Sequence, residues 1–547
     1  MDKILQVIAE INSAINGVVW GWPMIILILG TGIFLTIRTK ALQVRKFSTS
    51  WAETIIPTVK DMGKHPVSLN SKETTVSPFE AFATAISGTV GTGNIIGVTS
   101  AIMSGGPGAV FWMWISAFFG MVTNYAENVL GMFFRKKDEA TGEFSGGPMQ
   151  YLSNGMGKDV DGKWGEFLRG FGKVLGVMAA VFCVFAAIGM SGAQTNNIAG
   201  TFEDIFAKVE GVNTDVVVLI AGIVIAIVVA LVILGGIKAI GRVASILVPF
   251  MSLLFILMAI VIIIANASMI GNAFALIFGN IFAFESAVAG FSGYVFAQII
   301  QKGLARGVFS NEAGLGSSVI AHSASETREP VKQGLWGIFE VFFDTFIICT
   351  LTALVILVSF GDASGQANIL YAENALSTTV VSMRAFEGVF GTVGTVIYAI
   401  IIPLFALTTI LAWSYYGEKC VQFLFQKAGP KAQKIASIVF KVLYVALIVV
   451  AAVMENTLAW EISDTFNGLM ALPNLIGLVF MGGLVAQITQ NYFDRKAGKD
   501  VTPMLSAYPE QNAQFILDLQ KETATAENAE TAEVAEVAEV ADAAEEA

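Results

Sequence analysis

Long apolar stretches recur along the whole chain, separated by short polar segments. A transmembrane helix needs about 20 mostly apolar residues to cross a hydrocarbon core of about 30 Å. The pattern therefore predicts an all-α polytopic membrane protein with about eleven transmembrane helices. The predicted spans cover residues 20–37, 78–103, 107–134, 171–199, 216–237, 243–265, 283–301, 334–360, 391–416, 435–454 and 469–487.

The composition agrees with this pattern. Of the 547 residues, 55% are hydrophobic and only 14% are charged, a balance that no soluble globular domain has. The first apolar stretch, 20–37, is too long for the apolar region of a signal peptide, and no small-residue cleavage pattern follows it. We therefore expect it to remain in the membrane as a span.

Most of the formal net charge of −11 comes from the C-terminal end. Residues 521–547 carry eight Glu and one Asp against a single Lys, which accounts for −8 of that charge. This segment is rich in Ala, Glu and Val and has no aromatic residue to bury. We therefore expect a disordered or weakly helical acidic tail.

Lys and Arg residues in the short loops indicate the orientation of the spans, because cytoplasmic loops carry the excess of these residues. Each odd-numbered span is followed by a basic cluster, whereas the alternate loops are acidic or neutral. This predicts an inner-membrane protein with its N-terminus outside and its C-terminus in the cytoplasm. The clusters lie at 38–46, 135–137, 238–242, 302–306, 419–434 and 495–499.

The second span contains the sequence SGTVGTGNIIG, residues 87–97, with four glycines. Non-helical backbone at membrane depth persists only where it lines a buried cavity, because every amide and carbonyl needs a partner. A break near Gly91 and Gly93 would create two half-helix ends. The N-terminal end of one half could bind an anionic group of a substrate, and the unwound carbonyls could bind a cation. Alternatively, the small residues only allow neighbouring helices to pack closely.

A second glycine interruption lies five spans later, at Gly290 and Gly293. In transporters, discontinuous helices occupy corresponding positions of two inverted repeats. One extra N-terminal helix followed by two five-helix repeats, each with one discontinuous helix, accounts for all the spans. The predicted boundaries are 1–77 for the extra helix and a cytoplasmic loop, 78–265 and 266–495 for the repeats, and 496–547 for the C-terminal segment with its tail.

Polar groups inside the spans are mainly hydroxyls and amides. Glu127, Glu340 and Asp344 are the available intramembrane carboxylates, and none lies in either glycine break along the sequence. We expect these carboxylates to hydrogen-bond to neighbouring helices. Hydroxyl and carbonyl oxygens suit a hard monovalent cation, so the sequence favours coupling to sodium, with coupling to protons as the alternative.

Other classes of function have little support in the sequence. The three cysteines are far apart in apolar segments and there are only two histidines, so we expect neither a disulfide nor a transition-metal site. There is no GxxxxGK[ST] motif and no nucleophile with an adjacent base, which argues against an enzyme. A channel is a less favoured alternative, because it needs polar rings along a continuous path. We expect no organic cofactor and no nucleic-acid partner.

Five longer motifs resemble the alanine or glycine:cation symporter family, the bacterial sodium:alanine symporters. They are GTVGTGNIIGVTSAI, GGPGAVFWMW, SGGPMQYL, ARGVFSNEAGLGSS with the AHS that follows, and FALTTILAWSYYGEKC. The resemblance covers residues 20–494. This family belongs to the amino acid, polyamine and organocation superfamily. The resemblance implies the LeuT-type inverted-repeat fold and sodium-coupled uptake of small neutral amino acids, such as alanine and glycine, by alternating access.

The resemblance also implies a substrate site at the break in the second span. There, main-chain and side-chain groups would contact the carboxylate and amino groups of the substrate, and further residues would close a small pocket. A simpler interpretation of the Gln194 and Trp413 side chains is ordinary contact between helices. The implied substrate residues are Thr89, Gly91, Thr92, Gly93, Asn94, Gln194, Gly290, Phe291, Gly293 and Trp413.

The implied sodium site lies between the first and the eighth helix of the repeats. Its candidate ligands are the carbonyls of Ser87 and Val90 and the hydroxyls of Thr408 and Thr409. Each threonine hydroxyl has the simpler alternative of a hydrogen bond within its own helix. The sequence GVFSNEAGLGSS, residues 307–318, is expected to be a structural or gating element on the cytoplasmic side.

Overall fold

The computed structural model describes residues 2–62, 76–137, 142–207, 209–282, 292–360, 377–454 and 456–521. Most of these residues form helices, which confirms the predicted all-α class. Eight of the described helices are long and apolar enough to cross a membrane, and two bent helix pairs raise this number to ten. The acidic tail expected at the C-terminus lies outside the described residues.

The predicted division into an N-terminal part and two repeats stays a prediction, and its boundaries are used below only to group the elements. The N-terminal part contains α1 Asp2–Val19, α2 Trp22–Arg38, α3 Leu42–Arg45, α4 Phe47–Glu53 and α5 Ile55–Met62. The first repeat contains α6 Pro78–Thr89, η1 Thr92–Asn94, α7 Ile96–Gly105, α8 Ala109–Phe133, β1 Lys136–Lys137, β2 Phe144–Ser145, α9 Pro148–Gly155, α10 Gly162–Phe206, α11 Thr214–Ile233 and α12 Gly236–Ala265. The remainder contains η2 Ala267–Met269, α13 Ile270–Gly279, α14 Ser292–Asn311, α15 Ser318–His322, α16 Pro330–Val341, the π-helix η4 Phe342–Cys349, α17 Thr350–Phe360, α18 Thr378–Phe390, α19 Thr392–Phe425, η5 Gln426–Ala428, α20 Pro430–Ala452 and α21 Asn456–Lys496.

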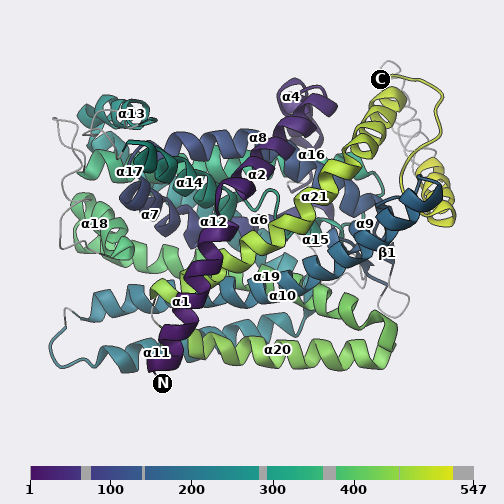
Figure 1. The fold of residues 1–547 in the computed structure, drawn as a ribbon. Helices are drawn as coiled ribbons and strands as arrows, with labels where there is room; N and C mark the ends of the chain where they lie inside the picture. Colours follow the sequence, from purple (N-terminus) through teal and green to yellow (C-terminus); the bar gives the residue numbers. More distant parts are fainter. Residues whose placement is uncertain are drawn as a thin grey trace, which may run out of the picture.

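Helices α10, α11 and α20 run roughly side by side, whereas α1 and α2 cross them steeply and α21 crosses them obliquely (Figure 1). Helix α10 packs along α19 and α21, and α11 packs along α20. Helices α13, α17 and α18 gather at one end of the molecule, whereas α9, β1 and the C-terminal residues lie at the other end (Figure 1). We call the end at which α2, α8, α19 and α21 finish the basic end.

Helix α6 begins at the basic end with a strong start signal. The Ser77 hydroxyl accepts a hydrogen bond from the Glu80 amide at 3.1 Å, and the Ser77 amide donates to the Glu80 carboxylate at 2.9 Å. Pro78 occupies the first turn. This capping box fixes the start of α6 and therefore how far the helix extends before the glycine-rich stretch.

Basic side chains at this end form ion pairs with acids from other loops. Lys419 lies 2.7 Å from the Glu143 carboxylate, and Arg495 lies 2.7 Å from the Glu329 carboxylate. These pairs join the ends of α19 and α21 to the loops that follow α8 and precede α16. The basic clusters thus help to hold the loops of this end together.

One predicted basic cluster does not belong to this end. The Lys302 side chain lies beside Gly105, where α7 finishes, and Arg306 forms an ion pair with Asp464 near the start of α21. Asp464 and Arg495 are on one helix and lie about 45 Å apart at 1.5 Å per residue. The assignment of Lys302 and Arg306 to the same side as the other clusters is therefore wrong.

The reason is that the expected seventh span, 283–301, does not end at residue 301. Residues 283–291 lie outside the described residues, and α14 continues from Ser292 to Asn311. Lys302 and Arg306 are therefore inside a helix and not in a loop after one, so the positive-inside rule does not apply to them.

The C-terminal residues up to 521 pack against the basic end. The Ala507 amide donates to the Phe133 carbonyl at 2.8 Å, and Leu505 is fully buried. The ring of Phe515 lies 6.0 Å from the ring of Phe144, between centroids. The segment that follows α21 is thus part of the folded protein as far as these residues.

This packing predicts different outcomes for two truncations. Truncation after residue 521 should leave the melting temperature unchanged, because it removes none of the contacts above. Truncation after residue 499 should lower it by several degrees, because burial of each side chain such as Leu505 or Phe515 is worth about 1.5–3 kcal/mol. Thermal unfolding of the purified protein in detergent checks both, and an equal melting temperature for the two truncations would contradict the packing.

Candidate functional site

The predicted break in the second span is present. Helix α6 ends at Thr89 and α7 begins at Ile96, and the two halves of this span are bent by 53°. Gly91 between them is extended, with φ −125° and ψ −159°. Every residue from Ser87 to Asn94 is buried. The break therefore places irregular backbone inside the protein, where water cannot satisfy it.

Side chains satisfy the unwound backbone instead. The Gly91 amide donates to Asn94 Oδ1 at 2.9 Å. The amide and the hydroxyl of Thr92 both donate to Gln194 Oε1, at 3.1 Å and 2.8 Å. Asn197 Nδ2 donates to the Thr92 hydroxyl at 2.6 Å. Helix α10 thus contributes Gln194, as predicted, and also Asn197, which the sequence did not single out.

Glycine is required at the break because other groups approach its backbone. A Cβ atom at Gly91 would lie 2.3 Å from Thr409 Oγ1, and one at Gly93 would lie 3.3 Å from the ring of Phe309. At Gly88, a Cβ atom would lie 2.8 Å from the Tyr416 hydroxyl. The glycines therefore let α19 and α14 reach the main chain of the break.

Predicted cation ligands converge where α19 meets α6. The Thr409 hydroxyl lies 3.0 Å from the Ser87 carbonyl and 3.1 Å from the Phe405 carbonyl, and it can donate its one proton to either. The Thr408 hydroxyl lies 3.0 Å from the same Phe405 carbonyl and 3.1 Å from the Leu404 carbonyl, both in its own helix. Val90 is buried at the C-terminal end of α6. The Phe405 carbonyl is an additional oxygen here, and it was not predicted because any residue type can supply a carbonyl.

A second interruption lies between α14 and α15. Residues 312–317 separate these helices, and Glu312, Gly314 and Gly316 all have positive φ, at 55°, 93° and 76°. This segment was expected to be a structural or gating element on the cytoplasmic side. In the structure, α14 contacts η1, so the segment begins beside the first break.

Glu312 connects this interruption to α19. Its carboxylate accepts a hydrogen bond from Trp413 Nε1 at 2.9 Å and from the Ser317 hydroxyl at 2.5 Å. The Trp413 ring also packs edge-on against Tyr416, with centroids 5.5 Å apart. Trp413 is fully buried, but its contacts are with Glu312 and Tyr416, whereas the aromatic ring next to Gly93 belongs to Phe309.

Of the other predicted substrate residues, Gly290 and Phe291 lie outside the described residues. Gly293 is in the first turn of α14. Their assignment to the substrate pocket stays a prediction. The first break meets the C-terminal end of α14, at Phe309 and Ser310, whereas Gly293 is at the N-terminal end of this helix.

One intramembrane carboxylate reaches the first break, which the sequence analysis did not expect. Asn94 Nδ2 donates to Asp344 Oδ1 at 2.5 Å. The hydroxyls of Ser310 and Thr345 donate to Asp344 Oδ2 at 3.0 Å and 2.8 Å. The expectation that no intramembrane carboxylate lies at a glycine break is therefore wrong. Asp344 is far from Asn94 along the sequence, but the fold brings the two side chains together.

The remaining two carboxylates behave as expected and hydrogen-bond to neighbouring helices. Asn474 Nδ2 donates to the Glu127 carboxylate at 2.5 Å. The Glu340 carboxylate lies 2.9 Å from His322 Nε2. Both acids are fully buried. These contacts join α8 to α21 and α15 to α16.

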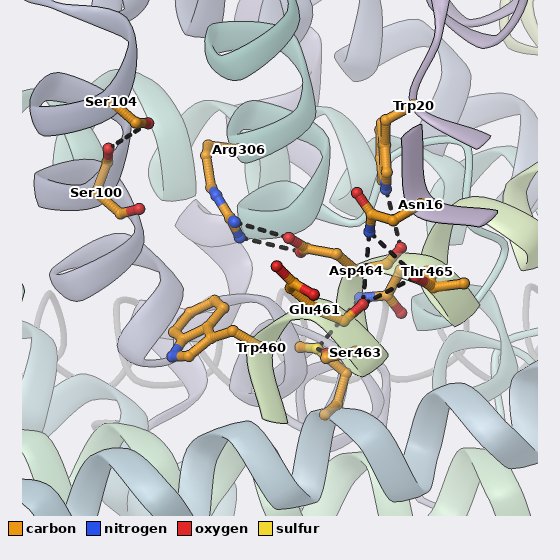
Figure 2. A network of polar contacts seen from close by, with 12 residues as sticks. Asn16, Trp20, Ser100, Ser104, Arg306, Trp460, Glu461, Ser463, Asp464 and Thr465 are labelled. Carbon is orange, nitrogen blue, oxygen red and sulfur yellow. Dashed lines mark hydrogen bonds and ion pairs between the residues drawn. The ribbon is translucent and has the colours of Figure 1, made fainter. Parts of the chain in front are cut away.

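An aromatic and ionic layer covers the break on the side away from the basic end. Arg306 forms a two-point ion pair with Asp464, with distances of 3.0 Å and 2.7 Å, as Figure 2 shows. The guanidinium also lies over the rings of Phe309 and Trp460, 5.4 Å and 5.2 Å from their centroids. Trp460 Nε1 donates to Asn197 Oδ1 at 3.1 Å, which links this layer to the Thr92 hydroxyl.

The N-terminal helix contacts the same layer. The indole of Trp20 donates to the Asp464 carbonyl at 2.9 Å, and Asn16 Nδ2 donates to the Thr465 hydroxyl at 3.1 Å (Figure 2). Gln301 of α14 donates to the Trp20 carbonyl at 2.7 Å. The chain around Trp20 is therefore bonded to both helices that form the ion pair.

The fold defines the class of this protein. It is similar to the crystal structure of MhsT in complex with L-phenylalanine, with a TM-score of 0.50 and 14% identity over 77% of this chain and 99% of that one. Together with the helix breaks, this likeness shows that the chain has the LeuT-type fold, as predicted.

The chain belongs to the sodium:alanine symporter family, whose profile matches residues 5–505. It is 40% identical to the sodium/alanine symporter AgcS of Methanococcus maripaludis, over 88% of this chain and 96% of that protein. It is 33% identical to the probable sodium/glutamine symporter GlnT of Bacillus subtilis, over 90% and 93%. The putative sodium/proton-dependent alanine carrier protein YrbD of Bacillus subtilis is also 33% identical, over 93% and 97%. The protein is thus a multi-pass membrane protein of a family that carries out secondary active amino-acid symport.

The close approach of α19 predicts the effect of two alanine substitutions. Gly91→Ala should reduce the initial rate of alanine uptake into proteoliposomes by at least about tenfold, because its Cβ would overlap the Thr409 hydroxyl at 2.3 Å. Gly97→Ala is the matched control, because the nearest atom to its Cβ is 4.0 Å away, on Trp460. Uptake that is normal in both variants would contradict the described backbone contact.

The Arg306–Asp464 ion pair predicts how accessible the break is to solvent from the side away from the basic end. Asp464→Asn should increase the labelling rate of a Gly97→Cys reporter by an impermeant thiol reagent roughly tenfold, because a charge-assisted pair of this kind is worth about 1.5–3 kcal/mol. Glu461→Gln, on the same helix, should leave the rate unchanged. The native cysteines at 183, 349 and 420 are buried and give little background. Equal labelling in the Asp464 variant and its parent would show that the pair does not close this side.

Proposed function

We propose that the protein takes up small neutral amino acids, alanine and glycine, together with sodium, by alternating access around the first helix break. The observation that carries this proposal is the contact between α19 and α6. Carbonyls of Ser87 and Phe405 and hydroxyls of Thr408 and Thr409 converge there, inside a fully buried region. Such neutral oxygens are suited to a monovalent hard cation.

The ion would link the two repeats. Ser87 belongs to the first repeat, whereas Phe405 and Thr409 belong to the second. In the structure, hydroxyls of Thr408 and Thr409 lie within hydrogen-bond distance of the two carbonyls. Sodium would bind the hydroxyl oxygens and the carbonyl oxygens together. It would thereby hold α19 against α6, so that ion binding favours one arrangement of the repeats.

The substrate would bind at the break itself, at residues Thr89 to Asn94. The start of α7 offers a helix N-terminus to the carboxylate group, as anions favour. The side chain of the substrate would face Gly93 and the nearby Phe309 ring. We expect the Phe309 ring, which lies next to Gly93, to form one wall of the pocket, so that a methyl group fits and a branched side chain meets the ring.

Coupling to protons is a second candidate, and one observation favours it. The Asp344 carboxylate lies at the first break, 2.5 Å from Asn94, and a buried carboxylate can carry a proton. The sodium proposal is supported by the names of several relatives in the family, and the two coupling modes make different predictions for uptake.

For the orientation, we propose that the basic end faces the cytoplasm. Five of the six basic clusters lie there, and the corrected cluster at Lys302 and Arg306 lies at the other end, within α14. The protein would then lie in the inner membrane, with its N-terminus outside the cell and its C-terminal residues in the cytoplasm.

Uptake in proteoliposomes distinguishes the alternatives. Labelled alanine should accumulate with an inward sodium gradient and not with an inward proton gradient alone. Unlabelled glycine should compete nearly as well as alanine, whereas leucine and phenylalanine should compete at least about tenfold less well, because they overlap the aromatic wall. Accumulation on a proton gradient in the absence of sodium would overturn the sodium proposal, and strong competition by leucine would overturn the pocket.

A further inference from the structure

A groove of about 1030 Å³ opens at the basic end, between the starts of α6 and α16, the residues that follow α8, and the helix formed by residues 509–521. Three lysines with exposed side chains line this groove, namely Lys136, Lys137 and Lys332. In the part of the chain that the structure describes, no carboxylate lies within 4.0 Å of their ammonium groups. The groove therefore presents three positive charges that no described acid neutralises.

The acidic residues of the lining are engaged elsewhere. Asp518 forms an ion pair with Arg328 at 3.3 Å, and Glu329 forms one with Arg495 at 2.7 Å. The third acid of the lining, Glu326, also has an interaction of its own. An acid that neutralises the three lysines has to come from outside the lining.

Two of the lysines contact aromatic rings. The Lys136 ammonium group lies 5.2 Å from the ring centroid of Tyr508, and that of Lys137 lies 5.9 Å from the ring centroid of Phe144. Such contacts are weak at exposed positions, and they leave the N–H donors of the ammonium group open to an anion. The lysines therefore remain available for ion pairs.

The C-terminal helix 509–521 brings the end of the described chain to this groove. Its Phe515 side chain is buried, and the Arg135 guanidinium lies 5.6 Å from the centroid of that ring. Asp518, one turn further on, lines the groove and holds Arg328. The residues that follow 521 therefore begin at the edge of the groove.

These following residues carry the opposite charge. After Lys521, the acidic tail contains eight Glu, one Asp and no Lys or Arg. Between residues 527 and 542 an acid recurs at every third position. A flexible chain of the 26 residues that follow Lys521 has an end-to-end distance of about 25–30 Å, which is enough to cross the groove. A tether of this length also gives an effective concentration in the millimolar range.

We propose that this groove binds the acidic tail of the same chain, with tail carboxylates against Lys136, Lys137 and Lys332. The match to the family profile ends at residue 505, so the helix that forms one wall of the groove and the tail that fills it both lie beyond the matched residues. The interaction is thus an addition to the transport machinery, and it depends neither on the coupling ion nor on the substrate.

The position of the groove gives the bound tail a defined place in the fold. Pro78, in the first turn of α6, and Lys332, in the first turn of α16, both line the groove. The two helix starts are already connected, because the Glu326 amide donates to the Val76 carbonyl at 2.8 Å. The tail would therefore lie across the start of the broken helix and its junction with the loop before α16.

The strength of the interaction follows from its exposure. Exposed ion pairs are individually weak, and salt screens them. The tail should therefore leave the groove at high ionic strength. Its removal should also leave the melting temperature unchanged, as expected for truncation after residue 521.

Acetylation of lysines by a water-soluble succinimidyl ester, followed residue by residue by mass spectrometry, tests the proposal on the full-length protein in a neutral detergent. In about 50 mM salt, the three groove lysines should react at least about threefold more slowly in the full-length protein than after truncation at residue 521, because an occupancy of about two thirds leaves one third of the amines free. In about 500 mM salt the difference should disappear.

The chain supplies a matched set of control lysines. Lys427, Lys431 and Lys434 are exposed at the same end of the molecule, around η5 and the start of α20, and they do not line the groove. They should react at the same rate in the full-length and truncated proteins. Equal size-exclusion profiles and melting temperatures show that the proteins compared are folded.

A full-length variant with a neutralised tail separates charge from bulk. It keeps the length of the tail, and its groove lysines should react as fast as those of the truncated protein. Its substitutions are Glu527→Gln, Glu530→Gln, Glu533→Gln, Glu536→Gln, Glu539→Gln and Asp542→Asn.

Several results would overturn the proposal. Equal reaction of the groove lysines in the full-length, truncated and neutralised proteins shows that the tail does not bind there. If these lysines are then protected only in nanodiscs that contain phosphatidylglycerol, and not in phosphatidylcholine alone, the groove binds an anionic lipid headgroup instead. Equal protection of the control lysines shows that the tail covers the basic end without selecting the groove. Protection that persists in the neutralised variant shows that bulk and not charge places the tail.

Discussion

The structure depends on one requirement: where a helix is broken inside a membrane protein, side chains must satisfy the backbone amides and carbonyls that the helix no longer pairs. At the first break, Asn94 accepts from the Gly91 amide, Gln194 accepts from the Thr92 amide, and Thr409 donates to the Ser87 carbonyl. These partners come from the break itself, from α10 and from α19. The packing of the long helices is therefore arranged around a few amides and carbonyls that ordinary helices would satisfy internally.

This requirement also explains which features the sequence could predict. Local signals were sufficient for most of the spans and for the break at Gly91 and Gly93, and they made Gln194 and Thr409 conspicuous as polar residues among apolar ones. The Phe405 carbonyl could not be predicted, since backbone oxygens leave no trace in the residue type. Asp344 was recognised as an intramembrane acid, but its position beside Asn94 depends on how α16, η4 and α14 pack, which a linear pattern does not contain.

The second interruption shows a different limit. The segment 312–317 was quoted as part of a family motif, and its glycines were visible, but its place after two basic residues suggested a loop outside the membrane. In the structure those basic residues are part of α14, and the interruption is buried. Arg306 is tolerated there because Asp464 neutralises it and two aromatic rings cover it. Basic residues within α14 were therefore mistaken for a loop at the end of the span.

The two interruptions are connected by side chains and not only by proximity. Ser310, at the end of α14, and Asn94, in the first break, bond to the same Asp344 carboxylate. Glu312, just beyond α14, holds the indole of Trp413 on α19, one turn after Thr409. A change at either break therefore alters the partners of the other, which is the physical basis expected for concerted movement of the repeats.

The helix that precedes the predicted repeats is attached on one side of the molecule, and this has a consequence for the energetics of the cycle. Trp20 is bonded to the backbone of α21 and, through Gln301, to α14, so separating these two helices on that side also strains the attachment of a third element. Two repeats related by internal symmetry would otherwise give two openings of similar energy. The attached helix adds hydrogen bonds to one face, so opening of that face has to break contacts that the symmetry of the repeats alone would not include.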